Sequence, residues 1–363
     1  MFKSYSQRLA ALGSVCFVLT LSACSDAGTS SGGAAASTSA GAVAADGLST
    51  TVDPAYTGPD SKNFTTLKEP SKKDGVAFKV GFLTLNGGQP VLTAMQKAAE
   101  TEVEKLGGQF IAKDASVDPQ KQVSQMNELI TAKVDVIIGH PVVSGALAPS
   151  VAKAKAAGIP FIAIGTPFDQ TKAGVPGAVT AVVQGFDYIV YRTMKSLSER
   201  HPGAAFSTMG LALPVDQLTY MNARMEFWGK KFGLKFQGKV DAQNDTPSGF
   251  SPAASTILTK YPKTEIIVTY NDQSAVAAAS VVAAAGKKIF VATPNSGQSI
   301  SQAALKAKRL DLVYRTPWEN MGTQSAIAAY DVVSKQNLPL PAIVNVPSYL
   351  VTADTADKAR WIG

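Results

Sequence analysis

The 363-residue sequence has few of the side chains that enzymes use for catalysis. It contains two cysteines, Cys16 and Cys24, and two histidines, His140 and His201, so it has no Cys-x-x-Cys or His-x-x-x-His motif. The paired glycines 87–88 lack the third glycine of a dinucleotide-binding fingerprint. We therefore expect no enzymatic activity, no cofactor and no metal site.

Charge is also sparse. Charged residues make up 17% of the chain, the formal net charge is +7, and no run of basic residues is interleaved with aromatic side chains. Proteins that bind nucleic acid concentrate positive charge on one face, so we expect no nucleic-acid partner. A content of 45% hydrophobic and 8% aromatic residues is typical of a compact globular protein.

The N-terminus has the organisation of an export signal. Lys3 and Arg8 precede an apolar run over 9–21 that is too short to span a bilayer. The run ends in Leu21-Ser22-Ala23-Cys24, which resembles the lipobox of bacterial lipoproteins. The resemblance implies that the signal peptide 1–23 is removed and that Cys24 carries a lipid. We predict an exported protein, anchored to the cell membrane and facing the periplasm or the outer cell surface.

A tether follows the lipidation site. From Cys24 to about Thr50 the chain is poor in large apolar residues and rich in serine, glycine and alanine, which favours a flexible segment. We assign 24–75 to this tether and the remainder to the folded body. No later segment is apolar and long enough to be a transmembrane helix.

The body alternates short apolar runs with amphipathic segments. The alternation predicts strands at 78–85, 109–112, 134–139 and 159–164, with helices at 91–106, 118–132 and 146–157. In the second of these helices we expect Asp118 to be the N-cap and Pro119 the first helical residue. It continues with strands at 178–183, 204–211, 234–240, 265–270 and 288–292, and helices at 188–197, 218–232, 253–260 and 275–285. This pattern predicts an α/β fold with parallel sheets. Because one sheet of so many strands is unusual, we expect two doubly wound lobes.

Ligands of such sheets bind beyond the carboxyl ends of the strands. Polar residues gather at these ends, for example at 86–90, 140–141, 165–166, 271–272 and 293–295. Two such rims that face each other would form a cleft. His140 ends one strand and is expected to face this cleft as a hydrogen-bonding residue rather than as a metal ligand.

The order of several short segments resembles the type I periplasmic binding proteins of ABC sugar importers, over nearly all of 79–351. The segments are 99–107, 114–119 (Asp-Ala-Ser-Val-Asp-Pro), 134–138 (Val-Asp-Val-Ile-Ile), 156–162 (Ala-Ala-Gly-Ile-Pro-Phe-Ile) and 270–272 (Tyr-Asn-Asp). The resemblance implies two Rossmann-like lobes joined by a three-crossing hinge near Gln184, Thr316 and Pro347. It places 76–184 and 317–346 in the N-terminal lobe, and 185–316 and 347–363 in the C-terminal lobe.

The resemblance also implies ligand contacts. Arg224 matches the family's arginine in the second lobe, although an ion pair with a nearby acid is the alternative. Asn271 matches the family's asparagine after a strand, Asn295 lies where sugar binders carry an aspartate, and Thr316 lies where they carry a glutamine.

Two departures stand out in the first lobe. Sugar binders have Asn-Pro followed by two aromatic residues after the first strand, whereas this chain has Gln89-Pro90-Val91-Leu92. Their Asp-Arg pair is replaced here by Gly165 and Thr166. The candidates for a substitute stacking surface are Phe168, Phe186, Tyr220 and Trp318, and packing in the core is the alternative for each.

We therefore expect a monomeric solute-binding lipoprotein that delivers a small sugar-like or polyol ligand to an ABC permease. The expected ligand-binding residues are Gln89, Val91, Leu92, His140, Thr166, Arg224, Asn271, Asn295, Thr316 and Trp318. The alternatives are a sensor of the same fold that serves a chemoreceptor or kinase, and a binder of a small polar molecule other than a sugar.

Overall fold

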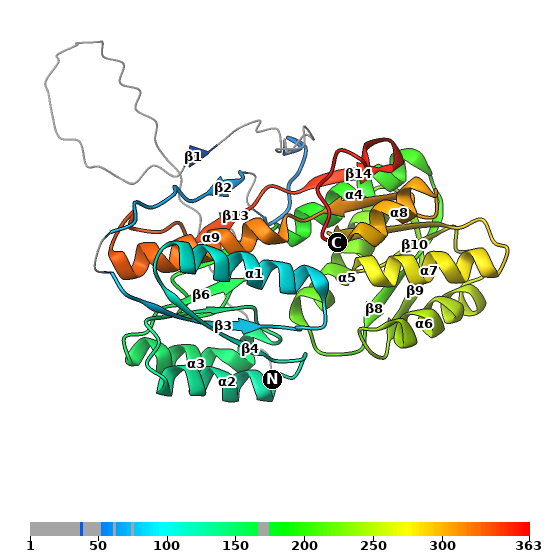
Figure 1. Ribbon diagram of the computed structural model, residues 1–363. Coiled ribbons are helices and arrows are strands. Elements are labelled where there is room, and N and C mark those ends of the chain that lie inside the picture. Colours follow the sequence, from blue (N-terminus) through cyan, green and yellow to red (C-terminus); the bar gives the residue numbers. More distant parts are fainter. Residues whose placement is uncertain (1–36, 39–51, 61–62, 74–75, 166–173) are drawn as a thin grey trace, which may run out of the picture. The chain divides into compact units, whose positions relative to one another are not determined.

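The computed structural model describes residues 37–38, 52–60, 63–73, 76–165 and 174–363 (Figure 1). The predicted lipidation site Cys24 and the predicted ligand contact Thr166 lie outside these residues. Among the described residues, no helix has both the length and the apolar character needed to cross a membrane.

The N-terminal lobe is built on a six-stranded parallel sheet. In spatial order its strands are β13 (Ile343–Asn345), β7 (Thr180–Val183), β6 (Phe161–Ile164), β5 (Val136–Gly139), β3 (Lys79–Thr84) and β4 (Gln109–Asp114). The direction of winding reverses at β3, so right-handed crossovers place helices on both faces. Figure 1 shows α1 (Pro90–Lys105) and α9 (Trp318–Ser334) above this sheet, and α2 (Pro119–Thr131) and α3 (Ser144–Ala156) below it.

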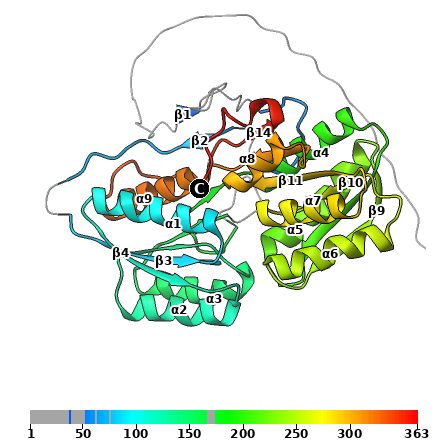
Figure 2. The same ribbon diagram turned by 45° about the vertical axis from the view of Figure 1, so that its right-hand side comes forward.

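The C-terminal lobe repeats this plan. Its sheet has the order β14 (Tyr349–Thr352), β12 (Leu312–Arg315), β11 (Phe290–Ser296), β10 (Ile266–Val268), β8 (Ala205–Leu211) and β9 (Lys235–Ala242), and only β14 is antiparallel to its neighbour. Helices α4 (Phe186–Arg200) and α5 (Asp216–Lys231) pack together, as do α6 (Pro247–Lys260) and α7 (Asp272–Ala284), which run along one side of the lobe in Figure 2. The short helix α8 (Ser299–Lys306) contacts α7 and the single-turn helix η1 (Ala353–Thr355).

The chain passes between the two sheets three times. It leaves the first sheet after β7, returns between β12 and α9, and leaves again between β13 and β14. Because of the second crossing, α9 packs on α1 and on strands of the first sheet although it follows the second lobe in sequence.

Burial explains why the predicted strands form. Every residue of β5, β6, β7, β8 and β10 is buried, as expected for strands of parallel sheets that are covered on both faces. The cap predicted at Asp118 is also present, because its carboxylate accepts from the backbone N–H groups of Gln120 and Lys121 at the start of α2.

The predicted extent of the tether is wrong at its C-terminal end. Val52–Asp60 and Asn63–Lys73 lie against the folded body, where Tyr56 and Phe64 belong to the hydrophobic core and Thr65–Thr66 form β2. β2 pairs with β1 (Ser37–Thr38). The composition after residue 50 contains the aromatic side chains that make this packing favourable, and the serine- and alanine-rich part before it does not.

Candidate ligand-binding site

A cavity of about 70 Å³ lies between the two lobes. Its walls come from the carboxyl ends of strands and the first turns of helices in both lobes, as expected for doubly wound sheets. The lining residues are Leu85, Gln89, Val91, Leu92, His140, Phe186, Val215, Gln217, Leu218, Asp245, Tyr270, Asn271, Asn295 and Trp318.

The first lobe supplies one wall through the start of α1. Pro90 occupies the first turn of this helix, where its missing N–H leaves no intrahelical hydrogen bond unmade, and Gln89 precedes it in an extended conformation. This geometry places Gln89, Val91 and Leu92 at the cavity. A polar amide and two aliphatic side chains therefore stand where sugar binders of this fold carry aromatic rings.

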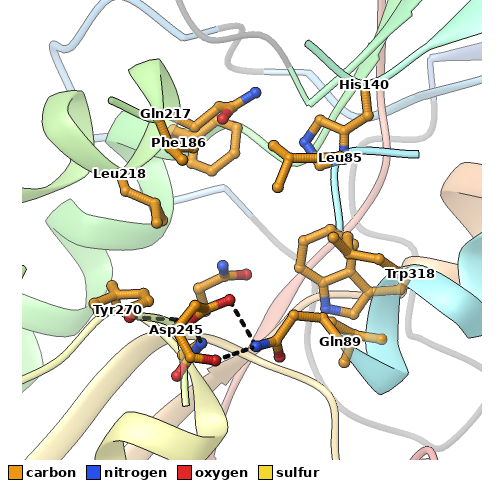
Figure 3. Close-up of a pocket in the computed structure, with 14 residues that line it drawn as sticks. Leu85, Gln89, His140, Phe186, Gln217, Leu218, Asp245, Tyr270 and Trp318 are labelled. Carbon is orange, nitrogen blue, oxygen red and sulfur yellow. Dashed lines mark hydrogen bonds between the residues drawn. The ribbon is translucent and has the colours of Figure 1, made fainter. Parts of the chain in front are cut away.

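Asp245 is the charged group of the cavity and joins the two lobes. Its Oδ2 accepts from Gln89 Nε2 at 2.6 Å and from Asn86 Nδ2 at 3.1 Å, both in the first lobe. Its Oδ1 accepts from Tyr270 OH at 3.0 Å and Asn271 Nδ2 at 3.1 Å in its own lobe. Figure 3 shows Gln89 and Asp245 meeting across the cavity. Burial raises the pKa of Asp245, and these hydrogen bonds oppose that change.

A second set of contacts joins the lobes at α5. Asp216 Oδ2 accepts from the backbone N–H of Ser144 at 2.7 Å, and the Asp216 N–H donates to the carbonyl of Val142 at 3.2 Å. Gln217 Nε2 donates to the carbonyl of Pro141 at 2.9 Å. With contacts at both Asp245 and Asp216, the two lobes are closed on each other in this structure.

Two buried polar atoms of the lining have no hydrogen-bond partner among the described residues. They are Nδ1 of His140 and Nε1 of Trp318. Burial lowers the pKa of His140 to about 4, so its ring is neutral at pH 7 and offers one donor and one acceptor. Trp318 offers a donor only. Because unpaired buried polar groups are unfavourable, these two atoms are the candidates in the described lining for hydrogen bonds to a ligand.

Trp318 begins α9, directly after the second crossing. Its ring passes close to Gly297, where a Cβ atom would lie 2.8 Å from Trp318 Cδ1 and 2.9 Å from Val91 Cγ1. A glycine is therefore required at 297 for the indole and Val91 to keep their positions in the cavity wall.

Seven of the ten expected ligand-binding residues line the cavity: Gln89, Val91, Leu92, His140, Asn271, Asn295 and Trp318. Asn271 also caps α7, since its Oδ1 accepts from the N–H of Ser274 at 2.8 Å. Thr316 does not line the cavity; it is fully buried behind it and its hydroxyl donates to Asn295 Oδ1 at 3.4 Å. It therefore supports Asn295 rather than the ligand space.

Arg224, an expected ligand contact, does not line the cavity in this structure. Its guanidinium forms an ion pair with the fully buried Asp187, which also accepts from Trp228 Nε1 at 2.9 Å and from Tyr56 OH at 2.7 Å. The guanidinium also lies 4.0 Å from the ring centroid of Phe227. The alternative of an ion pair is therefore correct, although the partner is a buried acid on α4 rather than a surface neighbour.

Sequence reasoning missed six residues of the cavity lining: Leu85, Val215, Gln217, Leu218, Asp245 and Tyr270. Phe186, a candidate stacking surface, lines the cavity, whereas Phe168 lies outside the described residues. For Asp245 a signal was available, because it follows the strand β9 and precedes Pro247 at the start of α6, which is the strand-end position that the fold favours for ligands.

The described part of the cavity has few charged side chains. Its described lining contains one acid and no lysine or arginine. Among the described residues, no group of three or more histidine, cysteine, aspartate or glutamate side chains could hold a metal ion.

Comparisons with known proteins agree with this geometry. Residues 80–337 match the family described as periplasmic binding protein domain. The ribose import binding protein of Bacillus subtilis (strain 168) is 24% identical over 266 residues, which cover 70% of this chain and 82% of the relative.

Solved structures share the fold. An ABC transporter solute-binding protein from Mycobacterium smegmatis with bound glycerol is 20% identical, with a TM-score of 0.68 over 79% of this chain and 98% of that chain. A second ABC transporter solute-binding protein, from Bacillus halodurans C-125 with bound myo-inositol, is 22% identical. Its TM-score is 0.70, and the match covers 79% of this chain and 98% of that chain.

The family match covers well over half of the chain, and the two parallel-stranded α/β lobes predicted from the sequence are confirmed. Members of this family bind substrates and are not enzymes, in agreement with the sequence analysis. The chain therefore belongs to the periplasmic binding protein family and has its type I fold.

Proposed function

We propose that this protein is the solute-binding subunit of a bacterial ABC importer and that it captures a small neutral polyhydroxy compound. The observation that carries the proposal is the cavity itself, which lies between the two lobes and is lined by polar and apolar side chains from both. A ligand held in this position contacts both lobes at once and so stabilises the closed state over the open state.

The charges of the lining support a neutral ligand. An anion would lie near the Asp245 carboxylate with no lysine or arginine among the described lining residues to compensate it. Hydroxyl groups, in contrast, both donate and accept, which suits the neutral His140 ring and the Trp318 N–H. The apolar side chains of Val91 and Leu92 suit the C–H surface of such a compound. Glycerol and myo-inositol, which are bound in two related structures, belong to this chemical class.

The three crossings between the sheets support a hinge. We place its pivots near Gln184, Thr316 and Pro347, where the chain leaves one sheet for the other. Rotation about these segments would separate Asp245 from Gln89 and Asp216 from Ser144, which opens the cavity to solvent. Closure would then present surfaces of both lobes to a permease.

The N-terminal sequence supports attachment to a membrane. Removal of residues 1–23 and lipidation of Cys24 would hold the body at the membrane surface. An exported protein agrees with the family, and the lipid is our inference from the sequence.

A ligand screen tests the proposal. We would heat the protein in the presence of neutral sugars and polyols, each paired with its carboxylate analogue, and record the unfolding temperature. A ligand at a hundred times its Kd stabilises the folded state by about 2.7 kcal/mol, so a true ligand gives a clear upward change.

The variant Leu92→Trp, which fills the cavity, is the matched control and we expect it to lose the response. The proposal is wrong if no neutral compound raises the unfolding temperature, or if the carboxylates raise it more than their neutral partners.

A further inference from the structure

The N-terminal segment ahead of the family domain contacts both lobes. We use the name hinge strap for its described residues, 52–60 and 63–73, which precede the matched residues 80–337. The first half packs on α4 and α5 of the second lobe, and the second half packs on α9 and β13 of the first lobe.

The first half is held by buried contacts to α4. Tyr56 is fully buried and its hydroxyl donates to Asp187 at 2.7 Å. Asp60 is buried and accepts from the N–H of Tyr188 at 2.8 Å, in the first turn of the helix, where backbone N–H groups lack intrahelical partners. Asp53 accepts from Lys195 at 2.6 Å near the strap's beginning.

The packing of Tyr56 adds to these hydrogen bonds. Its ring lies 5.0 Å from those of Tyr188 and Tyr191 and 6.1 Å from that of Trp228, measured between centroids. Gly58 allows the strap to approach closely, since a Cβ there would lie 2.0 Å from Asp187 Oδ2. This half of the strap is therefore part of the second lobe's core.

The second half is held by the first lobe. The N–H of Leu67 donates to Gln324 Oε1 at 2.5 Å, and the N–H of Lys73 donates to Tyr330 OH at 2.7 Å, both on α9. The carbonyl of Asn63 accepts from Asn345 Nδ2 at 3.3 Å, at the end of β13. The hydrogen bonds of each half are thus made mainly to a different lobe, while the ring of Phe64 in the second half also lies 6.4 Å from that of Tyr188 in α4.

The strap lies beside the hinge, next to the first and third crossings between the sheets. Gly185 follows β7 in the first crossing, with φ of 66°, and a Cβ there would lie 3.4 Å from Asp60 Oδ2 and from Asn345 Oδ1. Asn345 ends β13 just before the third crossing. Three consecutive Cα–Cα links join Asp60 to Asn63, so their Cα atoms can separate by at most about 11 Å.

We propose that the hinge strap limits how far the two lobes open, with Tyr56 and Asp60 as the residues that fix it to the second lobe. This inference rests on the hinge motion proposed above. By restricting the open state, the strap shifts the population toward the closed state and raises ligand affinity. It also connects the hinge directly to the segment that leads to Cys24.

Cutting the strap tests this inference in the full chain. A specific protease site inserted between residues 61 and 62 allows the strap to be cut while both halves keep their contacts. The same site inserted between residues 50 and 51 is the control, because its cleavage leaves the strap whole. Because the insertion at 61–62 lengthens the strap even before cleavage, the reference is the wild type. We would measure the radius of gyration of the wild type and of each cleaved protein by small-angle scattering, with and without the best compound of the ligand screen.

We expect cleavage at 61–62 to increase the radius of gyration of the unliganded protein and to weaken ligand binding about fivefold, while the control changes neither. Tyr56→Phe, which keeps the ring but loses the hydroxyl, provides a second variant if the cut chain loses its fold. We expect this variant also to increase the radius of gyration of the unliganded protein.

The outcomes separate the two proposals. If ligand compacts the protein but cleavage and Tyr56→Phe change nothing, the strap inference is wrong and the binding function stands. If cleavage widens the protein but no compound compacts it, the strap inference stands and the proposed ligand class is wrong. A radius of gyration that never changes overturns both.

Discussion

Gly297 has no side chain, and this leaves the space that Trp318 and Val91 occupy in the cavity wall. A methyl group at this position would press against Trp318 and Val91 at contact distances that real Cβ atoms do not show. We expect Gly297→Ala to displace the indole and weaken ligand binding about tenfold, since overpacking of this kind costs roughly 1 to 3 kcal/mol. Isothermal titration with the ligand found by screening measures the change.

Gly145→Ala is the matched control for this substitution. Gly145 lies in α3, and a Cβ there would have no atom within 4 Å. We expect this variant to bind normally and to gain about 0.5 to 1 kcal/mol of stability from its helix position. Unchanged binding in Gly297→Ala would show that the indole does not contact the ligand.

Substitution of Arg224 tests whether this side chain stabilises the fold or contacts the ligand. Its removal leaves the buried Asp187 carboxylate without its cation, which we expect to destabilise the protein by about 3 kcal/mol in Arg224→Ala. Because the side chain does not line the cavity, ligand affinity at a temperature where the variant is folded is expected to stay the same. Urea unfolding and titration measure the two effects, and a large loss of affinity in a folded variant would restore the ligand role.

His140 makes stability depend on pH. Burial lowers its pKa to about 4, below the ordinary value of 6.5, so between these values the unfolded chain binds a proton that the folded protein does not. The contribution of His140 is therefore present above pH 6.5 and is lost as the pH falls toward 4. When the pH falls from 7 to 5, we expect protonation of this histidine in the unfolded chain to lower the free energy of unfolding by about 2 kcal/mol.

His140→Gln removes the titrating group and keeps a polar side chain. Urea unfolding at pH 7 and pH 5 compares the two proteins, and we expect the variant to lose less stability on acidification. Equal losses in both would show that the imidazole titrates normally.

At the scale of elements, the loop between β9 and α6 closes the cavity against the start of α1. Asp245 in this loop accepts from Asn86 and Gln89 of the first lobe, and hydrogen bonds to a charged group each contribute about 1.5 to 3 kcal/mol. We expect Asp245→Ala to enlarge the unliganded protein in small-angle scattering and to weaken ligand binding at least tenfold.

Asp357→Ala is the control for this loop. Asp357 is an exposed acid of the second lobe whose carboxylate pairs with Lys306 outside the cavity lining, so its loss leaves the contacts between the lobes intact. Identical scattering curves for wild type and Asp245→Ala would mean that this carboxylate does not hold the lobes together.

Some helices could be predicted from the local sequence pattern and others could not. The helix over 118–132 was predicted because Asp118 and Pro119 mark its start and apolar residues recur at helical spacing, and α2 occupies Pro119–Thr131. In contrast, α8 and α9 were not predicted as helices. For α9 the reason is burial on nearly every side, which gives an apolar sequence without a polar stripe.

At the scale of the whole molecule, the proposed lipidation of Cys24 would decide where the protein works. We expect wild-type protein expressed in a bacterial host to incorporate labelled palmitate and to sediment with membranes. Cys24→Ser is expected to lose the label and the membrane association, because diacylglycerol attaches to the thiol. Cys16→Ser, within the signal, is the matched control and is expected to behave as wild type. Retention of the label in Cys24→Ser would place the lipid elsewhere.

The sequence by itself determined the properties that local patterns encode. Continuous apolar runs separated by amphipathic segments predicted parallel sheets, and strand-end positions predicted that Gln89, His140 and Asn271 lie at one cavity. These signals are local because burial on both faces of a sheet selects apolar residues strand by strand.

Only the tertiary structure decided which distant groups meet. It paired Arg224 with Asp187, brought Asp245 to Gln89 and laid Tyr56 against α4. The partners in these three contacts are 37, 156 and 131 positions apart in sequence, in that order, and no local pattern records such a pairing. The energetic reason is that a buried charge or hydroxyl is stable only with a partner, and the fold, not the neighbouring sequence, supplies that partner.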